Sequence, residues 1–218
     1  MSEPVRLLRP LVVADDRSGR LALERRARAL AWIGIVWHVV EFAIAIGAGI
    51  AAGSIALIGF GADSLIEALA GLVVVWLFTG GRLGSRAAER RAQKLIAASF
   101  FALAAYVSIE SVWTLASGRH PGTSWVGIGL AAFTAPTMPL LARAKRRLAT
   151  QLNSAAAVKE ASQTQLCAYL SLALLAGLGA NALAGWWWAD PIAALFIAGV
   201  ATREGRQSWR GEGCCDLC

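Results

Sequence analysis

The sequence is poor in charged residues, which make up only 16% of its 218 positions, whereas hydrophobic residues make up 57%. A water-soluble domain usually devotes about a quarter of its residues to charged side chains. The mean hydropathy of +0.56 agrees with this shortage of charge. The composition therefore excludes an ordinary soluble domain and predicts an integral membrane protein.

Cysteine is also scarce, and three of the four cysteines (Cys214, Cys215 and Cys218) lie within the last five residues. This spacing is not the disulfide framework of a small secreted domain. We expect no signal peptide, because several arginines precede the first apolar stretch and no small-residue cleavage site follows a short apolar core. The C-terminal thiols leave two readings open, a soft-metal site or a tail with incidental cysteines.

Signatures of hydrolytic enzymes are missing too. The chain has no H-E-x-x-H motif and no nucleophile with a nearby base, so we expect no enzymatic activity and no resident cofactor. The formal net charge is +7, but the basic residues gather between apolar runs. In membrane proteins such clusters set the orientation of the chain, so we expect no nucleic-acid partner.

Six apolar runs have the character of membrane-spanning helices, which need roughly 20 mostly apolar residues. They cover 29–51, 54–78, 93–115, 125–141, 161–184 and 186–201. Backbone groups inside lipid must be satisfied within each segment, which favours helices. The sequence thus predicts an all-α, polytopic membrane domain of six transmembrane helices over residues 29–201. A cytoplasmic segment (1–28) precedes it, and a short cysteine-containing cytoplasmic tail (202–218) follows it.

Along the chain, segments rich in lysine and arginine alternate with segments that have few. They are dense in the N-terminal segment, between the second and third runs, between the fourth and fifth runs, and in the tail. The other three links carry Arg119 alone. Because basic loops stay on the cytoplasmic side, we expect both termini in the cytoplasm. We assign the chain to a cell membrane, and its compactness and arginine usage favour a bacterial inner membrane.

The second apolar run contains two acids, Asp63 and Glu67, that lie four residues apart. In a helix this spacing puts both on one face, about 5–6 Å apart. An ionisable side chain at the bilayer centre costs roughly 2.5–3.5 kcal/mol, and like charges so close together favour capture of a proton or a cation. A rise of about 1.5 Å per residue puts Asp63 near mid-membrane, where transporter sites lie. The pattern predicts a cation site; a polar pair tied up by hydroxyl and backbone groups is the other reading.

Two further pairs share a helix face in the same way. His38 and Glu41 are three residues apart in the first run. Neutral histidine is a good zinc ligand, so this pair is either a ligand or proton relay, or a core histidine paired with its neighbour. Gln163 and Cys167 are four residues apart in the fifth run. A thiolate is a soft ligand and an amide oxygen a weak one. This pair therefore supports a metal site only when it is considered together with the acids of the second run.

Two more acids lie in apolar runs. Glu110 in the third run is either a proton carrier or a contact within the bundle. Asp190 precedes Pro191 at the start of the sixth run, which indicates a role at a helix N-terminus.

The second run resembles the second helix of the cation diffusion facilitators, in the stretches 53–57 (GSIAL) and 63–67 (DSLIE). That family consists of divalent-cation/proton antiporters with six helices and cytoplasmic termini. Its second helix carries an acid or histidine, three residues, and then an acid. The resemblance covers residues 29–209, and the basic link between the fourth and fifth runs is also similar.

Other positions match the family or depart from it. The family's Asp-Pro at the start of helix six is matched by Asp190 and Pro191. Its helix-five pattern of His, three residues and Asp is replaced by Gln163 and Cys167. The family's usual cytoplasmic metal-binding domain is not found after residue 201, so the chain looks like the small, transmembrane-only branch.

The resemblance implies a tetrahedral-type metal site between helices two and five, with Asp63, Glu67 and Cys167 as ligands. Gln163 would be a weak fourth ligand, or His38 would supply that position from helix one. The resemblance also implies a homodimer and alternating access.

We therefore expect a carrier that moves a divalent transition metal, zinc, out of the cytoplasm in exchange for protons. The predicted metal residues are Asp63, Glu67, Cys167, Gln163, His38 and Glu41. The alternative is a membrane metal sensor or an assembly partner that binds metal without transporting it. Transport predicts metal-dependent proton flux, whereas a sensor predicts binding without flux.

Overall fold

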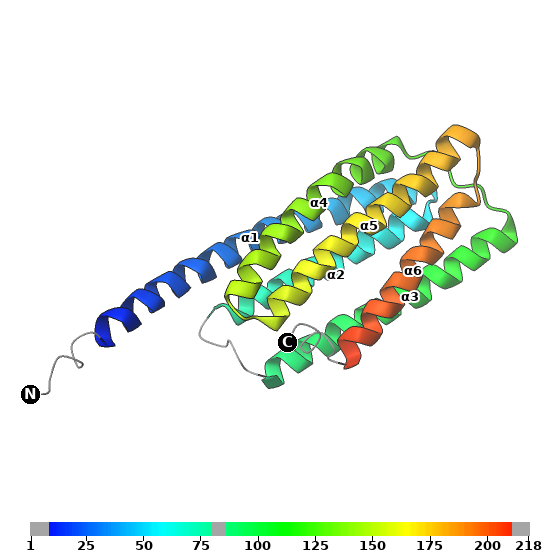
Figure 1. Ribbon diagram of the computed structural model, residues 1–218. Coiled ribbons are helices and arrows are strands. Elements are labelled where there is room, and N and C mark those ends of the chain that lie inside the picture. Colours follow the sequence, from blue (N-terminus) through cyan, green and yellow to red (C-terminus); the bar gives the residue numbers. More distant parts are fainter. Residues whose placement is uncertain (1–8, 80–85, 211–218) are drawn as a thin grey trace, which may run out of the picture.

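The computed structural model describes residues 9–79 and 86–210, and within these ranges all of the regular secondary structure is α-helical, joined by short links (Figure 1). The all-α prediction is thereby confirmed. The six helices are α1 (Arg9–Ala52), α2 (Ile55–Leu77), α3 (Arg86–Ser117), α4 (Trp125–Gln151), α5 (Ala155–Ala184) and α6 (Ala189–Arg210).

Helix α2 is the centre of the bundle. It packs against α1, α3, α5 and α6, and α1 also packs on α4. Of its apolar window, 61% is buried inside the protein, against 33–44% for the other apolar helices. Helices α3 and α6 lie side by side at one flank, and α1, α2, α4 and α5 form the rest of the bundle (Figure 1). Side chains of α2 therefore face the interior on several sides.

Five of the six helices are long and apolar enough to cross a membrane, and α6 is the exception. Large apolar side chains such as Ile50, Ile109 and Leu183 lie exposed on the outside of the bundle. Five spans of the predicted six thus meet the criterion of length and apolarity. The second half of α6 carries Arg203, Glu204 and Arg206, which shortens its apolar part.

The helices run beyond several of the predicted spans. Helix α1 is continuous from Arg9, so no break separates the predicted N-terminal segment 1–28 from the first span. Helix α4 likewise continues to Gln151, ten residues past the predicted end of the span at 141. Apolarity marks the part of a helix that suits lipid, whereas hydrogen bonding carries the helix further. The predicted tail cysteines lie outside the described residues.

Serine side chains set the start of three helices. Ser54, Ser124 and Ser154 each accept a hydrogen bond from the backbone N–H three residues later, at the N-termini of α2, α4 and α5. This is the preferred N-cap arrangement. Gly53 joins α1 to α2 with φ of +65°, a conformation that favours glycine. The short link fixes where α2 begins relative to α1.

Asp190 contacts the start of α2, although it lies 136 residues after Ser54 in the sequence. Its carboxylate, fully buried, accepts hydrogen bonds from Ser54 Oγ and from the backbone N–H groups of Ile55 and Ala56. A negative charge at a helix N-terminus is favourable because of the helix dipole. The predicted role at a helix N-terminus is therefore found, but at α2 as well as at the start of α6 itself.

Two lysine–glutamate pairs tie helices together near the end where α4 leads into α5. Lys145 on α4 pairs with Glu160 on α5 and also donates to Thr164 Oγ1 at 3.1 Å. Lys159 on α5 donates to Glu204 on α6 at 2.7 Å. The end of α6 and the start of α1 point to the same end of the bundle (Figure 1). The charge pattern of the sequence predicts only a topological role for these lysines, and the pairs arise from tertiary packing.

Candidate metal centre

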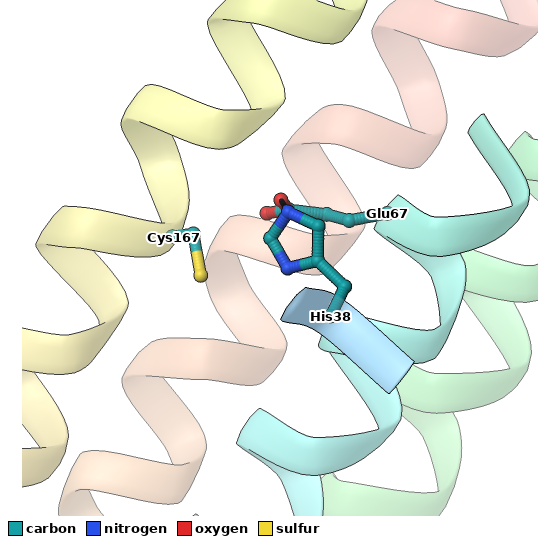
Figure 2. Close-up of side chains that lie close together, drawn as sticks. All are labelled: His38, Glu67 and Cys167. Atoms are coloured by element: carbon teal, nitrogen blue, oxygen red, sulfur yellow. Dashed lines mark ion pairs between the residues drawn. The ribbon is translucent and has the colours of Figure 1, made fainter. Parts of the chain in front are cut away.

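Three buried side chains from three helices converge at one point. His38 comes from α1, Glu67 from α2 and Cys167 from α5, and Figure 2 shows them turned toward one another. Each offers one ligand atom, and the three atoms all lie within 4.8 Å of one another. No more than 4% of any of these residues is exposed. We call His38, Glu67 and Cys167 the triad.

The triad lies deep in the bundle. Glu67 is twelve residues from the start of α2 and ten from its end, so it is close to the middle of the central helix. Helices α1 and α5 both pack against α2, which brings the other two members to the same level.

The imidazole of His38 lies between two carboxylates. Its Nδ1 is 3.2 Å from Glu41 Oε2, within hydrogen-bonding geometry. Its Nε2 is 3.0 Å from Glu67 Oε2. His38 Nε2 and Glu67 Oε2 are both fully buried, yet within the described part of the chain neither atom makes a well-aligned hydrogen bond. Buried polar atoms are nearly always paired, so this contact calls for a bridging proton or cation.

Glu41 lies beside the triad and is fully buried. Its Oε1 accepts a hydrogen bond from Thr134 Oγ1 at 2.6 Å, and its Oε2 accepts one from Ser64 Oγ at 2.9 Å. Cys167 Sγ is a further donor to Oε2, at 3.8 Å. The carboxylate is therefore surrounded by protein donors.

The remaining predicted metal residues are buried near this centre without joining the triad. Asp63 is 4% exposed, lies one turn before Glu67 and is within electrostatic range of it and of His38. Gln163 is also 4% exposed, and its Nε2 has no hydrogen-bond partner among the described residues. The structure thus brings histidine, glutamate and cysteine together and leaves the aspartate and the amide outside the triad.

Glu110 lies elsewhere. It is half-buried on α3 and lines a shallow hollow with Ile109 and Trp113.

Ser64 and Thr134 take part in the centre although the sequence analysis did not assign them a role. Ser64 immediately follows Asp63 in the predicted motif, so its place on the central helix was foreseeable. Thr134 on α4 gave no signal, because a threonine in an apolar helix commonly bonds a carbonyl one turn earlier in its own helix. Only the packing of α4 against α1 brings it to Glu41.

The triad combines a nitrogen, an oxygen and a sulfur donor. Zinc in proteins is bound by this mixture, and hard cations such as Mg²⁺ are bound by oxygen alone. Ligands around a tetrahedral zinc lie roughly 3.3–3.8 Å from one another, from the metal–ligand lengths. Atoms within 4.8 Å of one another need to approach by about 1.5 Å at most to reach that arrangement.

Comparison with known proteins gives no assignment: no protein-family model matches the chain, and no curated protein matches it significantly.

Proposed function

We propose that this protein is a membrane carrier that moves a divalent transition metal, zinc, out of the cytoplasm in exchange for protons. The triad is its mid-membrane substrate site. In this proposal the chain is a cation diffusion facilitator. The resemblance in residues 53–67 supports that family, and the triad supports the metal.

The contact between His38 Nε2 and Glu67 Oε2 carries the proposal. A carboxylate can only accept hydrogen bonds, so the hydrogen of a neutral imidazole belongs on the nitrogen that meets a carboxylate in good geometry, which is Nδ1. Nε2 is then an acceptor that faces a second acceptor at 3.0 Å. Two such atoms, both buried, need either a shared proton or a cation between them. Exchange of a metal ion for protons requires a position that can hold either one.

The surroundings of the triad support a membrane setting. A polar cluster lies inside a bundle whose outer surface is apolar, and five helices suit a bilayer. Intramembrane acids mark ion pathways. We propose that α6 completes a set of six spans, that the basic ends of the helices face the cytoplasm, and that the protein works as a homodimer in a bacterial inner membrane.

Asp63 and Gln163 have a place in this proposal. Both are buried beside the triad, and Asp63 is one turn from Glu67 on the same helix. We propose that they join the ion during alternating access, when the helices shift. Asp63 would then supply a second carboxylate, and Gln163 would offer its amide oxygen while its unpartnered Nε2 finds an acceptor.

Metal-dependent proton flux in proteoliposomes tests the proposed function. The protein is reconstituted with a pH-sensitive dye in the lumen, and zinc, cadmium, cobalt or manganese is added outside. We expect zinc to move protons across the membrane in the wild type. We expect His38→Ala to abolish the signal, because it removes the nitrogen of the triad.

His120→Ala is the matched control, since it removes the chain's other histidine, which is exposed and stacks on Trp187. We expect its flux to equal that of the wild type. Zinc binding without flux in the wild type would favour the sensor. Flux unchanged in His38→Ala would place the substrate site away from the triad.

A further inference from the structure

Glu41 is the most heavily hydrogen-bonded acid in the centre. Its two oxygens face Thr134 Oγ1, Ser64 Oγ, His38 Nδ1 and Cys167 Sγ. These donors belong to α4, α2, α1 and α5, so one carboxylate joins four helices. A carboxylate that accepts several hydrogen bonds in the interior is held in one orientation.

This arrangement argues against Glu41 as a metal ligand. Its Oε1 is engaged by Thr134 at 2.6 Å, and its Oε2 is shared by the serine and the histidine. A metal could reach the carboxylate only by displacing these donors. By contrast, Glu67 Oε2 is buried and receives no well-aligned hydrogen bond from any residue that the structure describes. Of the two glutamates beside His38, Glu67 is therefore the one that is open to a cation.

The histidine side of the contact has a chemical consequence. Histidines that bind metals through one nitrogen usually donate the other N–H to a carboxylate or carbonyl, which fixes the tautomer and the ring orientation. Here Nδ1 meets Glu41 in hydrogen-bonding geometry, and Nε2 lies 3.0 Å from Oε2 of Glu67, a member of the triad. The contacts are those of a carboxylate–histidine–metal arrangement.

We infer that Glu41 is a positioning residue that keeps hydrogen on His38 Nδ1, so that Nε2 presents its lone pair to the metal shared with Glu67 and Cys167. The inference rests on the proposed metal site, and it reassigns Glu41 from predicted ligand to holder of a ligand. Ser64 and Thr134 hold the carboxylate, and the carboxylate holds the imidazole.

Nitrogen-15 NMR of the histidines tests this inference in detergent-solubilised, metal-free protein. A His120→Gln background leaves His38 as the single histidine of the chain. We expect a protonated Nδ1 in this parent protein. In Glu41→Met, which removes the acceptor but keeps a side chain of similar length, we expect the hydrogen on Nε2, because Glu67 is then the remaining carboxylate beside the ring.

Zinc affinity provides the second readout. Loss of a partner that orients a metal ligand typically costs 10–100-fold in metal affinity, and we expect a loss of about this size in Glu41→Met. Glu41→Gln keeps an acceptor oxygen and is expected to restore both the tautomer and most of the affinity. Thr134→Val removes one hydrogen bond from Glu41 but leaves the contact between Glu41 and His38 in place. We therefore expect the tautomer of His38 to be unchanged in this variant.

An unprotonated Nδ1 in the parent protein overturns the inference. The spectrum of the parent protein gives this result even if Glu41→Met does not fold. An unchanged Nδ1–H in a folded Glu41→Met protein overturns it as well. The tautomer is read without metal, so a protein that fails to transport zinc can still show it. Zinc flux with a bare Nδ1 would remove this inference and leave the proposed function standing.

Discussion

Replacing Glu67 with glutamine is expected to weaken zinc binding by on the order of 100-fold or more. Changes to residues that merely orient a metal ligand cost 10–100-fold, and Glu67 supplies the anionic ligand of the triad itself. The amide keeps the shape of the side chain but removes the negative charge that attracts the ion. Isothermal titration of zinc into purified protein in detergent measures the effect.

Glu110→Gln is the matched control for this prediction. It neutralises another acid of an apolar helix, but one that lies on α3 outside the triad. We expect its zinc affinity to stay within about twofold of wild type, since α3 contributes none of the three ligand atoms and effects of a substitution away from such a site are usually small. Equal losses in the two variants would show that overall charge, and not the triad, governs binding.

Replacing Lys145 with methionine is expected to lower the free energy of unfolding by about 3–5 kcal/mol, the range found when one partner of a buried ion pair is removed. Lys145 is only 5% exposed and Glu160 only 6%, so the variant leaves a carboxylate buried without its cation. Helix α1 approaches the ammonium group so closely that a Cβ at Gly34 would lie 2.7 Å from Lys145 Nζ. Denaturation in mixed micelles measures the loss.

A second variant separates the lost charge from the lost packing. The double substitution Lys145→Met/Glu160→Met removes both charges, and apolar replacement of a buried pair is often neutral, so we expect most of the stability to return. Arg143→Met, at an exposed position of the same helix, should change stability by less than about 0.5 kcal/mol. A double variant as unstable as the single one would refute the buried-charge explanation.

Much of the fold was predictable from local patterns. The second apolar run, 54–78, matches α2 to within one residue at each end, because a serine cap and continuous apolarity define both limits. The predicted start of α4 at Trp125 is also correct. The extent of α1 was not predictable from apolarity, since the stretch 9–28 is rich in charged side chains yet continues the same helix.

The candidate centre was predictable in part. Helical spacing predicted that Glu67 and Cys167 each share a helix face with another possible ligand, and the structure brings these two side chains together. The resemblance implied Asp63, Glu67 and Cys167 as ligands and left Gln163 or His38 for the fourth position. Spacing within one helix could not show that His38 lies with Glu67 and Cys167, because that depends on how α1 turns against α2. The partners of Glu41 on α2, α4 and α5 are likewise a product of tertiary packing.

The number of protons released when zinc binds tests the central claim, that metal and protons compete for the same buried atoms. The measurement is calorimetry in two buffers of different ionisation enthalpy. The measurement uses a variant with the substitutions Cys214→Ser, Cys215→Ser and Cys218→Ser, which leaves Cys167 as its one remaining thiol.

Zinc ligands must be deprotonated, so binding releases protons. We predict about two protons per zinc, one from the His38–Glu67 contact and one from Cys167, and about one proton in Cys167→Ser. Zinc binding that releases no proton would contradict the exchange of metal for protons at this site.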